Sequence, residues 1–148
     1  MTSIESFQTL DRLLDETRGG ARLLAIPAIA DVVAESIRYC AAVMHHYELH
    51  AFSVMPNHVH LLITPNHPLP VILKSLKGFT ARRANALLTR SGKTFWLAES
   101  FDHLVRDHRE FEAIRRYVEE NPVRAMLVSL VEDYSWSSAN KRCVKAQV

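Results

Sequence analysis

The stretch that decides the fold is "YELHAFSVMPNHVHLLIT", residues 47–64, in which two β-prone runs flank a Pro-Asn pair. The runs predict two strands and Pro56-Asn57 predicts a turn, so we expect an antiparallel hairpin. In a strand, residues i and i+2 project to the same face, so His58 and His60 are expected to point together. Two imidazoles on one face can share a metal ion.

The histidine pair is weak evidence when taken alone. Eight histidines in 148 residues would produce an H-x-H spacing by chance roughly 0.4 times per chain. A metal site therefore needs support from other parts of the sequence.

On the N-terminal side of the hairpin, the apolar spacing predicts two helices. The first covers residues 4–17 and ends at Gly19-Gly20, and the second covers residues 28–44 after Pro27. The predicted order at this end is therefore helix, helix, hairpin.

On the C-terminal side, a basic amphipathic helix is predicted over about residues 71–89, followed by a short strand over "FDHLVRD", residues 101–107. Asp107 and Glu110 form a capping-box-like start to a last helix. That helix is expected to run to about Glu120 and to be stopped by Pro122. From about residue 139 the chain is polar and basic, and we expect a flexible tail there.

Length and composition are those of one ordinary folded domain covering residues 1–148, with 48% hydrophobic and 23% charged residues. No apolar run reaches the length of a membrane span, and residues 1–10 lack the features of a signal peptide. Cys40 and Cys143 form no disulfide or metal pattern, so a cytoplasmic location with no membrane partner is expected.

Basic residues are concentrated in one segment although the net charge is only +2. Between residues 71 and 93 there is no acidic residue, and the basic ones are Lys74, Lys77, Arg82, Arg83, Arg90 and Lys93. Such a segment can attract phosphate backbones, and the alternative is a solvated helix face.

Tyr117 and Asn121 on the last predicted helix are four residues apart and therefore share a face. The tyrosine hydroxyl and the amide can converge on one point. The alternative is a packed aromatic ring beside a C-terminal cap.

Four segments together carry a resemblance to a known family. In order and spacing, the chain resembles the REP-associated tyrosine transposase group of the single-tyrosine HUH transposases, over about residues 8–139, through "MPNHVHLLITP", "ARRANALLTRSGKTFW", "FDHLVRD" and "RRYVEENPVRAMLV". HUH denotes histidine, a bulky hydrophobic residue and histidine, which are His58, Val59 and His60 in this chain.

The resemblance implies a DNA strand transferase. His58 and His60 would hold Mg²⁺ or Mn²⁺ with Asn121 as a third ligand, and Tyr117 would attack a DNA phosphodiester to form a covalent 5′-phosphotyrosine. The implied substrate is single-stranded or hairpin DNA of palindromic repeats. The basic helix would bind this DNA and Trp96 would offer a stacking surface.

The resemblance also implies an α+β fold, a small antiparallel sheet of the ferredoxin-like HUH type packed with helices. Family members begin with a strand, whereas only Met1 to Ser3 precede the predicted first helix. This leaves open whether that strand is lacking and whether an N-terminal truncation impairs catalysis. The alternatives are then a hairpin-DNA-binding protein with impaired catalysis and a metal-dependent hydrolase unrelated to DNA. Monomer and homodimer both remain open.

Overall fold

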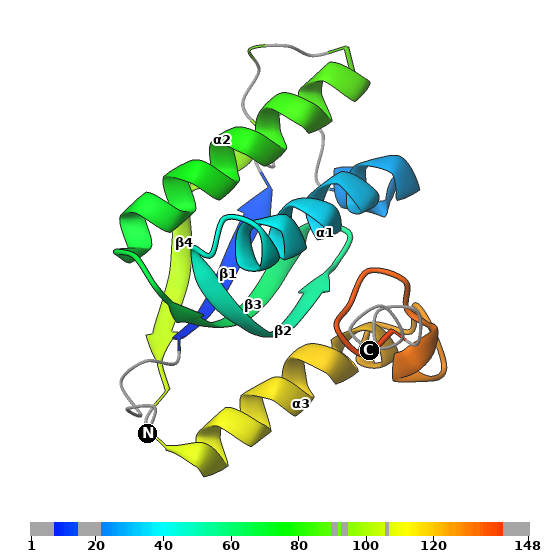
Figure 1. Cartoon of the computed structure of the whole chain (residues 1–148). Coiled ribbons are helices and arrows are strands. Elements are labelled where there is room, and N and C mark those ends of the chain that lie inside the picture. Colours follow the sequence, from blue (N-terminus) through cyan, green and yellow to red (C-terminus); the bar gives the residue numbers. More distant parts are fainter. Residues whose placement is uncertain (1–7, 15–21, 90–91, 93–94, 106, 141–148) are drawn as a thin grey trace.

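The computed structural model describes residues 8–14, 22–89, 92, 95–105 and 107–140, and a four-stranded antiparallel sheet organises them (Figure 1). In chain order the strands are β1 (Gln8–Leu14), β2 (Tyr47–Val54), β3 (His58–Pro65) and β4 (Trp96–Leu104). Their spatial order is β2-β3-β1-β4, so β3 and β1 lie in the middle of the sheet.

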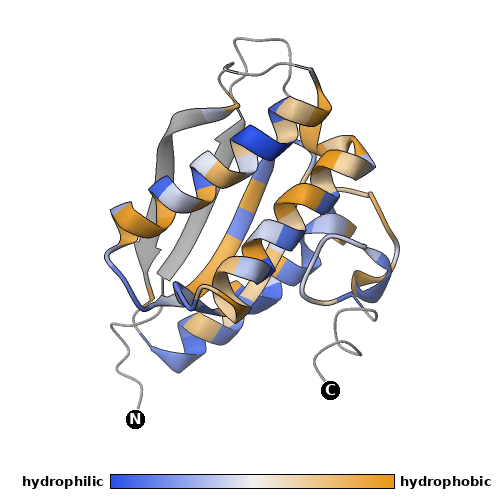
Figure 2. Cartoon of the chain, turned by 45° about the horizontal axis from the view of Figure 1, so that its top comes forward, coloured by the Kyte–Doolittle hydropathy of each residue, from blue (hydrophilic) through white to orange (hydrophobic). Residues whose placement is uncertain are grey.

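Three helices cover the two faces of the sheet. They are α1 (Pro27–Ala42), α2 (Leu69–Leu87) and α3 (His108–Arg124). Helices α1 and α2 lie over one face and α3 lies beneath the other (Figure 1). Polar and apolar residues alternate along the helices, as expected for helices with one face on a sheet (Figure 2). None of the described helices is long and apolar enough to cross a membrane.

The central strand β3 divides its side chains between the two layers. Val59, Leu61 and Ile63 belong to the large core that includes α1 and α2. Leu62 points the other way and packs with Val118 of α3. The alternation follows from the two-residue strand period, and it places even-numbered β3 residues on the face of α3.

Most of the predicted elements are confirmed, including the second helix, the hairpin, the basic helix, the strand after it and the last helix. The α+β fold class is also confirmed. The prediction of a helix over residues 4–17 is wrong, because Gln8–Leu14 forms β1. Its apolar spacing fits a helix, but pairing with β3 on one side and β4 on the other decides its conformation.

Strand β1 also corrects the expectation about the sheet. A strand preceding the first helix is present and pairs with β3 through Leu13, opposite His58, and through Asp11, opposite His60. The reason for suspecting impaired catalysis, a sheet without its first strand, therefore no longer applies.

Two expectations at the C-terminal end also change. Pro122 lies inside α3, which continues to Arg124, because its fixed φ fits a helix and the chain loses only the bond from residue 122 to the carbonyl of Val118. The predicted tail does not begin at residue 139, since Asn140 is buried and its side chain donates to the carbonyl of Glu132 at 3.1 Å. The rest of the predicted tail, residues 141–148, lies outside the described residues.

A C-terminal segment runs along the outer edge of β2. Ser137 forms an antiparallel bridge with Ser53, and Val54 donates a 2.8 Å backbone bond to the carbonyl of Trp136. Ser138 returns a 3.0 Å bond to the carbonyl of Phe52. These bonds satisfy backbone groups that an exposed edge strand would leave open.

Candidate active site

Two histidines at the start of β3 point to the same face of the sheet. The Nε2 atoms of His58 and His60 lie 2.9 Å apart, and the ring centroids are 4.6 Å apart. Since Leu62 two residues later packs against α3, this is the face that α3 covers. The His60 side chain is buried, with the residue 5% exposed, so its position is fixed by packing.

Helix α3 brings two further polar side chains to the same place. It begins after Asp107, whose carboxylate accepts a 2.8 Å bond from the backbone N–H of Glu110 and so caps the helix. Asn121 Nδ2 lies 3.1 Å from His60 Nε2. The ring centroid of Tyr117 lies 5.7 Å from that of His60. All four residues singled out by the strand and helix periods therefore meet at one point.

Helix α3 is held over the sheet by apolar and polar contacts. The apolar cluster consists of Ala51, Leu62, Val105, Phe111, Ile114 and Val118. The hydroxyl of Ser138 donates to Glu119 Oε2 at 3.0 Å and also lies 3.1 Å from the backbone nitrogen of Phe52. The C-terminal segment thus ties the half of α3 that carries Tyr117 to the edge of the sheet.

The polar atoms at this point suit a divalent cation. His58 Nδ1 lies 2.6 Å from Asn57 Oδ1, which can only accept, so Nδ1 carries the proton and Nε2 presents a lone pair. That lone pair, His60 Nε2 and the Asn121 amide converge on one point. A cation there could be bound by both imidazole nitrogens and, after a flip of the Asn121 amide, by its oxygen. Two imidazoles and one amide oxygen suit Mn²⁺ better than Mg²⁺.

The third donor explains why this site is not obvious from ligand counting. Among the described residues there is no group of three His, Cys, Asp or Glu side chains that could hold a metal. The third polar side chain beside the two histidines is instead the Asn121 amide of α3. The missing oxygen ligands would come from phosphate and water.

The chain has four tyrosines, and their environments differ. Tyr47 and Tyr134 are buried, and each donates its hydroxyl to a backbone carbonyl. Burial raises the pKa of the Tyr47 phenol and raises the pKa of Tyr134 to about 12. Tyr117 and Tyr39 are 47% and 46% exposed, and of these two only Tyr117 is in ring contact with His60. Tyr117 is thus an exposed tyrosine that lies beside the histidines.

Helix α2, which carries the basic segment, lies on the layer of the sheet opposite α3 (Figure 1). Lys74 and Arg82 are exposed along α2 and line an open groove together with Phe79. Arg83 pairs with Glu35 of α1 at 3.3 Å. Contact between these cations and a phosphate backbone stays a prediction. Arg90 lies outside the described residues.

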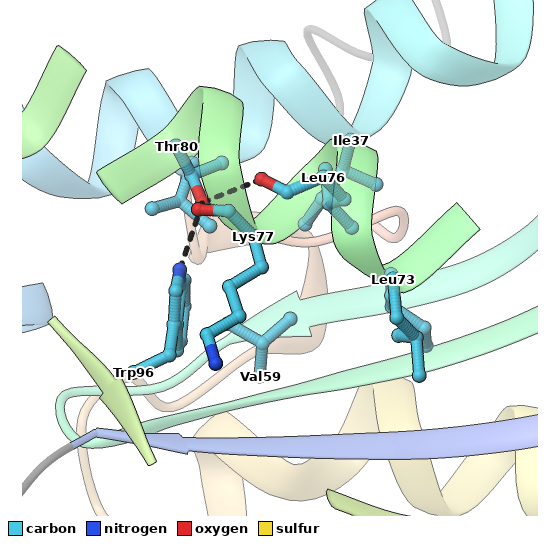
Figure 3. Close-up of a pocket in the computed structure, with 9 residues that line it drawn as sticks. Ile37, Val59, Leu73, Leu76, Lys77, Thr80 and Trp96 are labelled. Atoms are coloured by element: carbon cyan, nitrogen blue, oxygen red, sulfur yellow. Dashed lines mark hydrogen bonds between the residues drawn. The ribbon is translucent and has the colours of Figure 1, made fainter. Parts of the chain in front are cut away.

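Lys77 and Trp96 have different surroundings from those expected. Lys77 is half-buried and lines a small apolar pocket with Trp96 between α2 and the sheet (Figure 3). Trp96 is 3% exposed, and its indole N–H donates to Thr80 Oγ1 at 2.8 Å. The expectation that Trp96 stacks on DNA is therefore corrected, because its ring is part of the core. The sequence alone does not show whether an aromatic residue next to a basic segment stacks on DNA or packs in the core.

Two residues near the site were not singled out by the sequence. Asn57 orients His58, and its only signal is its position directly before the HUH motif. Arg124 lies with its guanidinium carbon 4.9 Å from the ring centroid of Tyr117. Its signal was available, since it follows Tyr117 by seven residues, which is two helical turns.

Solved structures with the same fold include two transposase-related proteins. One is the REP-associated tyrosine transposase bound to a REP hairpin, with a TM-score of 0.63 and 18% identity over 90% of this chain and 76% of that chain. At this identity the likeness concerns the fold. Another is a candidate transposase from Deinococcus radiodurans R1, with a TM-score of 0.50 and 25% identity over 77% of this chain and 88% of that chain.

Sequence comparison gives a further relative, which comes from the same organism as the second solved structure. The ISDra2 transposase TnpA of Deinococcus radiodurans is 36% identical over 70 residues, which are 46% of this chain and 49% of that protein. The chain thus matches about half the length of this curated relative.

A family profile described as "Transposase IS200 like" matches residues 26–121. The match extends from the start of α1 to Asn121 and contains His58, His60 and Tyr117. Because it spans more than half of the chain, the chain belongs to the IS200-like transposase family.

Proposed function

We propose that this protein is a metal-dependent DNA strand transferase that uses Tyr117 as its nucleophile. The observation that carries the proposal is the convergence of His58, His60 and Asn121 beside the exposed Tyr117 ring. Family membership makes phosphodiester chemistry the natural use of this arrangement.

His58, His60 and Asn121 are the residues that would hold Mg²⁺ or Mn²⁺. A divalent ion bound there would polarise a nonbridging oxygen of the DNA phosphate and offset its developing charge. Asn57 fixes the tautomer and the orientation of His58 through its Nδ1–H.

The covalent step balances in bonds and protons without a further co-reactant. The Tyr117 Oη–phosphorus bond forms while the bond from phosphorus to the 3′-oxygen breaks, which leaves a 5′-phosphotyrosine and a free 3′-hydroxyl. The proton that the phenol loses corresponds to the proton that the 3′-oxygen gains. A 3′-hydroxyl of another strand can reverse the step, which makes the net reaction strand transfer.

We propose single-stranded DNA with a hairpin, of the palindromic-repeat type, as the substrate. The fold relative bound to a REP hairpin supports this choice. Helix α2 lies on the layer opposite α3 (Figure 1), so its exposed cations would hold DNA away from the cleaved position. Monomer or homodimer and a cytoplasmic location remain predictions.

The test is covalent capture on a pool of hairpin oligonucleotides with randomised single-stranded flanks and Mn²⁺. We expect a denaturant-resistant protein–DNA complex that is lost with a chelator and with Tyr117→Phe. The affinity of Tyr117→Phe for DNA should stay within about threefold of wild type, because only one oxygen is removed.

The two alternatives give different results in the same assay. A hairpin-binding protein with impaired catalysis would retain DNA without forming the adduct. A hydrolase unrelated to DNA would neither retain DNA nor form the adduct. Either result overturns the proposed function.

A further inference from the structure

Arg124 is a cation placed directly at the proposed nucleophile. Tyr117, Asn121 and Arg124 lie at positions i, i+4 and i+7 of α3, which form one stripe on the helix. The Arg124 guanidinium carbon is 4.9 Å from the centre of the Tyr117 ring. The stripe thus carries a tyrosine, an amide and a guanidinium in sequence along one side of the helix.

The Arg124 side chain remains accessible. It is 52% exposed, and its Nη2 bonds Glu120 Oε2 at 3.2 Å. A guanidinium has five N–H donors, so one bond to Glu120 leaves capacity for a phosphate. The planar arrangement of these donors matches two oxygens of a phosphate at once.

We infer that Arg124 is a further catalytic residue, which binds the nonbridging oxygens of the phosphate that Tyr117 attacks. The inference rests on the proposed function. A phosphorus in line for attack lies about 3–3.5 Å from the attacking oxygen. Because the Arg124 guanidinium already lies over the Tyr117 ring, a change of its rotamer would bring its N–H groups to the nonbridging oxygens of that phosphate. Arg124 then neutralises the charge that grows on those oxygens as the Tyr117–phosphorus bond forms.

A structural role for Arg124 makes a different prediction. A cation in the last turn of a helix interacts favourably with the helix dipole, and the ion pair of Arg124 with Glu120 also stabilises the helix. Loss of that role would lower the melting temperature and leave the rate of the folded protein unchanged. A catalytic role lowers the rate at saturating DNA and leaves the melting temperature nearly unchanged.

The experiment measures the single-turnover rate of adduct formation at saturating hairpin DNA for wild type, Arg124→Gln and Arg124→Lys. Arg109→Gln is the matched control, because Arg109 is exposed on the same helix and lies about 12 Å along its axis from Tyr117. DNA affinity is measured for each variant in a Tyr117→Phe background, in which no adduct can form. Melting temperatures are recorded for all variants.

We expect Arg124→Gln to lower the rate about 100-fold, as loss of one charge-stabilising donor does in other enzymes. Arg124→Lys should recover at least tenfold of that loss, and Arg109→Gln should match wild type. A rate for Arg124→Gln within threefold of wild type overturns the inference, as does an equal loss for Arg109→Gln. A loss confined to affinity or folding overturns it also. If wild type forms no adduct, the proposed function fails together with the inference. If wild type forms the adduct and Arg124→Gln keeps its rate, only the inference about Arg124 fails.

Discussion

The two faces of the sheet differ in what their side chains do. The face under α1 and α2 is packed by an extended apolar core that includes residues from both helices and three strands. The face under α3 has a small apolar cluster, and next to it lie His58, His60 and Asn121. Among the described side chains, the larger apolar core thus lies on one face and the cluster of His58, His60 and Asn121 lies on the other.

Neighbouring residues of β3 show the same division. Leu61 is 1% exposed in the large core, and His60 one position earlier points to α3. A one-residue shift of register would exchange their faces, so Leu61 would leave the large core and His60 would no longer point to α3. The pairing of β3 between β2 and β1 prevents that shift.

The exposed tyrosines make the comparison sharper. Tyr39 on α1 is stacked against Phe79 of α2 at 6.1 Å between ring centroids, whereas Tyr117 on α3 contacts His60. Their exposed fractions are nearly equal. Exposure therefore does not distinguish Tyr39 from Tyr117, and the neighbouring side chains do.

The largest expected effect comes from substituting the two neighbours on β3. His60→Ala should lower the rate of adduct formation by at least about 100-fold, because the proposed metal site loses a ligand. Leu61→Ala should instead lower the free energy of unfolding by about 2–5 kcal/mol through the cavity it leaves. Urea unfolding and Mn²⁺ titration measure the two properties separately. Loss of Mn²⁺ binding in a folded Leu61→Ala protein would contradict the division of the faces.

A smaller effect is expected from the cations on the α2 layer. Lys74→Gln combined with Arg82→Gln should weaken DNA affinity and reduce the slope of log affinity against log salt by about 0.7 per lost contact to single-stranded DNA. The rate at saturating DNA should stay within about threefold of wild type, since these residues are on the layer opposite the histidines. An unchanged salt slope would show that this groove does not hold DNA.

The smallest effect concerns His50, a residue of β2 that faces α3. Its Nε2 lies 2.6 Å from Thr64 Oγ1, its ring contacts Phe111, and Glu48 is the carboxylate facing it at 4.0 Å. Burial lowers the pKa of His50 from its ordinary value of 6.5, and Glu48 opposes this in part. Below pH 6.5 the unfolded chain therefore binds the proton more readily, so the unfolding free energy falls as pH falls through this window.

His50→Gln checks this sign. The variant should show a shallower loss of unfolding free energy between pH 6.5 and lower pH than wild type does, measured by urea unfolding at each pH. Other histidines contribute equally to both proteins, so the difference isolates His50. A steeper loss in the variant would contradict the direction of the shift.

The parts of this structure that the sequence predicted depend on local periodicity. The histidine pair follows from the strand period, and the Tyr117–Asn121 stripe follows from the helix period. Strand β1 was predicted as a helix because its leucines also fit a helical spacing, and only pairing with β3 and β4 excludes it. Long-range pairing of this kind has no local signature.

Which layer an element joins is likewise a tertiary property. The sequence shows that α2 is basic, and the structure adds that it lies on the layer opposite His58 and His60. The burial of Trp96 against Thr80 depends on the same packing. The edge contacts of Ser137 and Ser138 with β2 join residues more than eighty positions apart, which no spacing argument predicts.

The most direct test of the central claim is to locate the DNA on the protein. The adduct formed with Mn²⁺ is digested with nuclease and protease, and tandem mass spectrometry identifies the tyrosine that carries the nucleotide. We predict that the nucleotide is on Tyr117 and that its yield falls to background in His58→Ala. A nucleotide on Tyr39, or an adduct on Tyr117 that persists in His58→Ala and without metal, would contradict the assignment of the chemistry to the α3 face.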